Sequence, residues 1–152
     1  MISVNVEVNS KPWLKKIKNP KKYFNQKLKK ISKIINFFEN KNIIFTILLT
    51  NSLNIKKLNK KFRKRNKSTD VLSFPSFSLK NLKSVRKKKI YIGDIATSYE
   101  IIYLRSKKKN FLAEFDKVWI HGLLHLIGYD HIRNKDYNKM SKIEKRIINL
   151  IT

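Results

Sequence analysis

Residues 118–131 read VWIHGLLHLIGYDH, and this stretch is the most informative part of the sequence for both fold and chemistry. The chain contains three His and three Gly, and all of the His and two of the Gly fall within residues 121–131. His121 and His125 are four residues apart, so their rings lie on one face of a helix. Apolar residues occupy nearly every other side of this helix, which predicts that it is buried.

The residues after the helix bring a third histidine within reach. Gly128 is well placed to end the helix, because glycine enters the left-handed backbone region without a Cβ penalty. The chain then turns, and His131 can return beneath the other two rings. Three neutral imidazoles around Zn²⁺, with water in the fourth position, form an open site of the catalytic kind, whereas structural sites normally have four protein ligands. We therefore predict one Zn²⁺ per chain, held by His121, His125 and His131; ordinary hydrogen-bonded core histidines are the alternative.

The rest of the chain alternates patterns typical of strands and helices. Apolar residues at every second position of residues 2–8 predict a half-buried strand. Asn19-Pro20 supplies an N-cap and a first-turn proline, and the helical spacing behind them predicts an amphipathic helix reaching Phe38. Strands are expected at 2–8, 42–49, 71–74 and 90–95, and helices near 20–38, 52–62, 98–104, 112–127 and 134–150. This order predicts a single α+β domain, with a mixed sheet of about four strands packed with about five helices.

Finer expectations concern caps, loops and the last helix. Thr50-Asn51 and Thr97-Ser98 are expected to cap the helices that follow them. Residues 79–89 are polar and basic without a usable period, which predicts a mobile loop. The last helix is expected to bury one apolar face, formed by Tyr137, Met140, Ile143, Ile147 and Leu150.

Composition excludes several classes of protein. Apolar residues make up 41% of the chain, enough for a core, and no apolar run is long enough to cross a membrane. The alternating N-terminal residues do not resemble a secretory signal, and the absence of Cys excludes disulfides and thiolate metal sites, so we expect a cytoplasmic protein. The net charge of +26 permits RNA binding but does not establish it, because the abundant Lys, Ile and Asn also fit an AT-rich genome.

The histidine spacing is also that of the metzincin peptidases, H-E-x-x-H-x-x-G-x-x-H. The second position of that motif is Gly122 here rather than Glu. Peptidases of this class use the Glu as the general base that acts on the zinc-bound water. The sequence therefore keeps the ligand spacing of this class and lacks its peptidase chemistry.

Residues 121–131, HGLLHLIGYDH, resemble the YbeY-type endoribonuclease family of rRNA maturation factors. Two further blocks agree with this resemblance. Leu58-Asn59, Phe62-Arg63 and residues 68–75 (STDVLSFP) are similar to the family pattern L-N-x-x-Y-R…P-T-D-V-L-S-F-P, and the third block is Gly93-Asp94-Ile95. The chain departs from the pattern at Phe62, Ser68 and Ala96, and at Lys117, where many members carry another His.

The resemblance implies a zinc-dependent, single-strand-specific endoribonuclease that acts in 16S rRNA 3′-end maturation and late ribosome quality control. It implies RNA as partner, namely precursor rRNA of the small ribosomal subunit. It also implies that the three histidines hold the metal and that Arg63 is needed for function. Without the resemblance, the sequence predicts only that Arg63 is a solvated surface charge among many other basic residues.

Three Asp lie close to these motifs and receive different interpretations. Asp70 precedes a strand and is expected to bond local backbone rather than to act in catalysis. Asp94 either orients a ligand histidine or braces its strand, and Asp130 is expected to fix the turn that delivers His131.

Two other functions compete with the ribonuclease. In one, the protein is a non-catalytic ribosome-associated factor in which zinc only joins the helix to the turn after it. In the other, the protein is a metzincin-like peptidase without the usual Glu.

Overall fold

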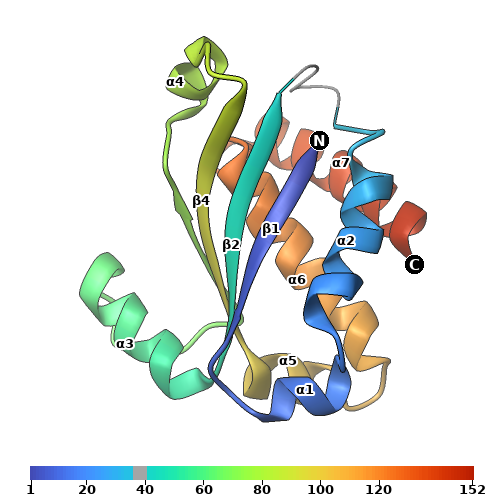
Figure 1. The fold of residues 1–152 in the computed structure, drawn as a ribbon. Coiled ribbons are helices and arrows are strands. Elements are labelled where there is room, and N and C mark those ends of the chain that lie inside the picture. Colours follow the sequence, from blue (N-terminus) through green and yellow to red (C-terminus); the bar gives the residue numbers. More distant parts are fainter. Residues whose placement is uncertain (36–40) are drawn as a thin grey trace.

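Four strands form one mixed sheet in the order β1-β2-β4-β3 (Figure 1). The computed structural model describes residues 1–35 and 41–152. The neighbouring pairs β1–β2 and β2–β4 are parallel, whereas β3 is antiparallel to β4 at one edge. The strands are β1 (Ile2–Val8), β2 (Asn42–Thr50), β3 (Val71–Pro75) and β4 (Lys89–Ser98). This confirms the α+β domain with a four-stranded mixed sheet that the sequence predicts.

Helices α2 and α6 pack on one face of the sheet, α7 packs against these two helices, and α3 lies against the other face of the sheet (Figure 1). The described residues form seven helices rather than the five expected: α1 (Pro12–Lys16), α2 (Pro20–Ile31), α3 (Ser52–Arg63), α4 (Leu79–Ser84), α5 (Tyr99–Arg105), α6 (Phe111–Leu126) and α7 (Asn134–Ile151). Over the described ranges, none of these helices combines the length and apolar character needed to cross a bilayer.

The two helices that the sequence did not predict, α1 and α4, are short, and each has one side chain buried in the core. In α1, Trp13 is fully buried and its Nε1 donates to the Thr50 carbonyl at 2.8 Å. Residues 79–89 were expected to form a mobile loop. This prediction is wrong for residues Leu79–Ser84, which form α4. Ser78 caps α4 by accepting from the Asn81 N–H at 3.3 Å, and Leu82 is buried in the core. A helix this short shows no period in its sequence, so only its packing reveals it.

Two of the expected caps are present and one is absent. The side chain of Asn19 accepts from Lys22 N at 3.0 Å, and that of Asn51 accepts from Asn54 N at 2.9 Å. Ser98 precedes α5 without capping it, because its hydroxyl instead pairs with the hydroxyl of Ser52 at 2.8 Å.

Burial along α2 and α7 departs in part from the expected pattern. The sequence predicts a helix from residue 20 to Phe38, whereas α2 ends at Ile31. Phe38 itself lies outside the described residues. On α7, Met140 and Ile147 are buried and Ile143 is partly buried, as expected. Tyr137 and Leu150 are exposed instead, at 58% and 39%. Both lie in a terminal turn of α7, and Ile151 completes the buried stripe because it is four residues after Ile147.

Helix α6 approaches the sheet unusually closely at Gly122. A Cβ on this residue would lie 3.0 Å from Cγ2 of Ile95 and 3.1 Å from Oγ of Ser73. The Ser73 hydroxyl also donates to the Gly122 carbonyl at 3.1 Å, which ties α6 to the edge strand β3. A Cβ here would force these side chains to shift by a few tenths of an ångström, and the close approach sets His121 and His125 beside β3.

A buried ionic network ties α6 to α2. Asp116 on α6 is 2% exposed and accepts hydrogen bonds from the Tyr23 hydroxyl at 2.5 Å, Lys27 Nζ at 2.6 Å and Trp119 Nε1 at 2.9 Å. Burial, reinforced by the charge of Asp116, raises the pKa of Tyr23 above its usual range, so the phenol remains a donor. The carboxylate is thus satisfied from three directions.

Replacing Asp116 by Ala should lower the free energy of unfolding by about 3 kcal/mol, because it leaves the partly buried Lys27 ammonium without its counter-charge and two donors without an acceptor. Urea denaturation followed by circular dichroism measures the change. Asp136→Ala is the matched control, because it breaks the exposed pair with Arg133 and should cost little. Equal losses in the two variants would contradict a structural role for the buried network.

Candidate metal centre

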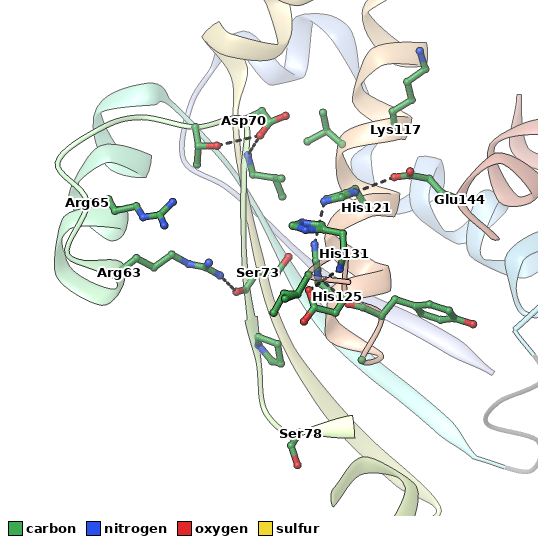
Figure 2. A pocket seen from close by; sticks show the side chains of 18 of the residues that line it. Arg63, Arg65, Asp70, Ser73, Ser78, Lys117, His121, His125, His131 and Glu144 are labelled. Carbon is green, nitrogen blue, oxygen red and sulfur yellow. Dashed lines mark hydrogen bonds and ion pairs between the residues drawn. The ribbon is translucent and has the colours of Figure 1, made fainter. Parts of the chain in front are cut away.

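Three imidazole rings converge at one end of α6 (Figure 2). One nitrogen from each of His121, His125 and His131 lies within 4.8 Å of the others. The ring centroids are 4.7 Å apart for the first two residues, and the ring of His131 lies 5.7 Å from the first and 5.1 Å from the second. The two helical histidines are half-buried and His131 is exposed. The structure therefore brings together the three histidines singled out by the sequence.

The chain reversal after α6 delivers the third ring. The helix ends at Leu126, and Gly128 has a φ of +95°, the left-handed conformation expected for it. The Tyr129 N–H then closes the helix end by donating to the Leu124 carbonyl at 2.9 Å. In the following turn, Asp130 Oδ1 accepts from the backbone N–H of His131 at 2.6 Å. Asp130 thus forms a hydrogen bond within the turn that carries His131.

Hydrogen bonds at Nδ1 orient the two helical rings. Nδ1 of His125 lies 3.0 Å from the carbonyl oxygen of Tyr129, which can only accept, so this nitrogen is the donor. Nδ1 of His121 lies 3.1 Å from Oε1 of Glu144 on α7. On the opposite sides of the rings, the two Nε2 atoms lie 3.1 Å apart. Both rings therefore direct Nε2 toward the same point.

This donor set fits a zinc ion. Two nitrogen ligands of a tetrahedral zinc site, each at about 2.0–2.1 Å from the metal, lie roughly 3.3–3.4 Å apart, close to the separation of the two Nε2 atoms here. Burial, together with the neighbouring His121 and His131, lowers the pKa of His125 below its usual value. The ring therefore remains neutral, as a metal ligand must be.

A groove of about 1060 Å³ contains the histidine cluster and has a basic opposite wall. Arg63 ends α3, and its Nη2 donates to the Ser73 carbonyl at 2.8 Å. Arg65, two residues further along, also lines the groove, and Figure 2 shows both arginine side chains extending toward β3 from the side opposite the histidines. The groove thus combines a cluster of imidazole nitrogens with cationic side chains that suit an anionic ligand.

The other residues that the sequence singled out lie in different places. Asp94 lies on the opposite face of the sheet, where its Oδ1 accepts from the Tyr91 hydroxyl at 2.6 Å, so it braces its strand. Asp70 lines the groove, accepts from Val71 N at 2.8 Å and pairs with Arg105, in keeping with the expected structural role.

Sequence reasoning did not single out Glu144 and Arg65. Glu144 lies four residues after Met140 and three before Ile147, at a position where the pattern of α7 calls for an apolar side chain. An acid on the inward face of an amphipathic helix is a signal the sequence does contain. Arg65 has no comparable signal, because it lies in a basic segment where each cation looks like its neighbours.

Comparisons with known proteins agree over nearly the whole chain. Residues 7–152 match the family described as "Endoribonuclease YbeY". The chain is 47% identical over 156 residues to the "Endoribonuclease YbeY" of Pelagibacter ubique, covering 99% of this chain and 97% of the relative. It is 38% identical over 149 residues to that of Buchnera aphidicola, covering 95% and 90%. The solution structure of TM1509 from Thermotoga maritima is similar with a TM-score of 0.62 at 26% identity, covering 99% of this chain and 89% of that one.

The free energy of unfolding of the metal-free protein should fall as the pH drops below about 6.5, the value for an unfolded histidine. Because the pKa of His125 is lowered in the folded chain, the unfolded chain takes up this proton first, and stability is lost until the pH passes the lower, folded value. Denaturant titrations of chelator-treated protein at several pH values, with wild type and His125→Gln, measure the effect. The variant should show a shallower pH dependence, and identical slopes would contradict the assignment.

Proposed function

Because this chain belongs to the endoribonuclease YbeY family, we propose that it is a zinc-dependent endoribonuclease specific for single-stranded RNA. We further propose that residues 1–152 act as one metal-dependent catalytic domain on precursor 16S rRNA of the small ribosomal subunit, in 3′-end maturation and late ribosome quality control in the cytoplasm. The observation that carries the proposal is the convergence of three imidazoles in a groove whose opposite wall holds two arginines.

His121, His125 and His131 would hold the zinc ion, one per chain. When bound at a site with three histidine ligands, zinc lowers the pKa of a water molecule toward about 7 and offsets charge that develops on a phosphoryl oxygen. The chain's own contribution is to orient the helical rings and to keep the His125 ring neutral. The Tyr129 carbonyl does this for His125, and burial keeps the proton off the same ring.

Arg63 is suited to orient the scissile phosphate. Its guanidinium donates from Nη2 to the Ser73 carbonyl, and among the described residues its other N–H groups have no side-chain partner, so they can form a two-point contact with a phosphate. A guanidinium held in this way loses little rotational freedom when the phosphate binds. Arg65 adds a second positive charge on the same wall of the groove. Together they favour a polyanionic substrate.

The peptidase alternative is disfavoured by the position of Gly122. No carboxylate follows the first histidine, and a side chain at this position would meet Ile95 and Ser73 rather than extend into the groove. The alternative of a non-catalytic factor with a structural zinc predicts that Arg63→Ala leaves RNA processing unchanged. It requires that RNA remain intact when the zinc is bound.

His125→Ala should abolish zinc binding and reduce cleavage of a labelled single-stranded RNA by about a hundredfold or more, because a bound metal contributes several kcal/mol of charge stabilisation. Elemental analysis and a gel-based cleavage assay measure the two effects, and circular dichroism checks that the fold is retained. The wild type should carry about one zinc per chain and should leave a duplex of the same sequence intact. Zinc-loaded wild type that leaves single-stranded RNA uncut would favour the non-catalytic factor.

Arg63→Ala should lower kcat/KM for the same RNA by about 10- to 100-fold, the range expected for one lost hydrogen-bonded charge contact. Arg63→Lys should recover only part of the loss, because an ammonium keeps the charge but not the two-point geometry. Arg146→Ala removes an equal charge from the exposed side of α7, outside the groove, and is the control. Equal rates for Arg63→Ala and Arg146→Ala would show that Arg63 contributes only to the net charge.

A further inference from the structure

Glu144 is an acidic residue on the inward face of α7. It shares that face with Met140 and Ile147, both of which are buried, so its side chain extends toward the protein interior. The side chain is only 28% exposed, and Oε1 lies 3.1 Å from Nδ1 of His121 (Figure 2). Within the described parts of the chain, this is the one carboxylate that contacts a ring of the histidine cluster.

The contact determines which nitrogen of His121 carries a hydrogen toward the protein. A carboxylate oxygen such as Oε1 of Glu144 accepts hydrogen bonds, and the contact therefore favours the tautomer of His121 in which Nδ1 donates to it. Nε2 is then the atom presented to the cluster, and it lies 3.1 Å from Nε2 of His125. Without an acceptor at Nδ1, the His121 ring would be free to rotate or to place its hydrogen on Nε2, where it would block a metal bond.

We propose that Glu144 is a positioning residue of the metal centre, which holds His121 through Nδ1 so that Nε2 faces the ion. This inference rests on the proposed function, because it takes the three histidines as the metal ligands. Glu144 acts through His121 and does not itself bind the ion. A carboxylate acceptor also makes the imidazole a stronger donor to the metal.

The two helical histidines are held in different ways. His125 is held by the Tyr129 carbonyl, a backbone group supplied by the end of its own helix. His121 depends on a side chain 23 residues further along the chain, on a different helix. The geometry of the cluster therefore depends on the packing of α7 against α6, and a single substitution on α7 is enough to test this dependence.

Zinc affinity, measured by competition with a chromophoric chelator, tests the proposal without reference to activity. Glu144→Ala should weaken zinc binding by about 10- to 100-fold, and Glu144→Gln should weaken it less, because an amide oxygen can still accept from Nδ1. Glu114→Ala is the matched control: Glu114 lines the same groove but pairs with Lys117 rather than with a histidine, so its removal should leave the affinity unchanged.

A second readout uses the metal-free protein. Proton NMR of wild type should show the resonance of the His121 Nδ1–H hydrogen-bonded to Glu144, and Glu144→Ala should lose this resonance while retaining the fold. Unchanged zinc affinity and a retained resonance in Glu144→Ala would overturn the proposal, as would an equal loss of affinity in Glu114→Ala. If the affinities follow the expected order but the wild type leaves RNA uncut, the proposed function fails and the positioning role stands.

Discussion

The hydrogen bonds that hold Nδ1 of the two helical histidines set the geometry of the site. One acceptor is the Tyr129 carbonyl and the other is the Glu144 carboxylate, and together they leave the two Nε2 atoms 3.1 Å apart. The first acceptor exists because Gly128 reverses the chain at a φ of +95°. The second exists because α7 packs against α6. A local turn and a long-range helix contact are therefore both required to present two nitrogens to one ion.

The position of α6 connects this geometry to the rest of the fold. Gly122 allows the helix to approach β3 and β4 closely, and the Ser73 hydroxyl is bonded to its carbonyl. Asp116 fixes the same helix to α2 through Tyr23 and Lys27. Because α6 is anchored on both sides, the histidines form one wall of a groove whose other wall is basic. A rigid helix holds donor geometry more accurately than a loop does, which suits a metal centre.

The features that could be predicted from the sequence are those that depend on residues close together along the chain. The four-residue spacing of His121 and His125 and the position of Gly128 follow from helix geometry alone, as do the caps at Asn19 and Asn51. The four strands follow from alternation and from β-branched content. The sequence could not show on which face of the sheet Asp94 lies. The pairing of β2 with β4 is irregular between Ile44 and Phe45, beside Gly93, and this irregularity interrupts the simple alternation of faces along β4. The contact of Glu144 with His121 spans 23 residues, and no local pattern encodes such a contact.

The central claim is that three imidazoles and one exchangeable ligand surround a single zinc ion, and zinc X-ray absorption spectroscopy of the loaded protein tests this claim most directly. We expect a four-coordinate spectrum with scattering from three imidazole rings, nitrogens at about 2.0–2.1 Å, and one further light atom that inhibitory anions displace. A spectrum with two imidazoles or fewer, or with a fourth protein donor that no anion displaces, would contradict it.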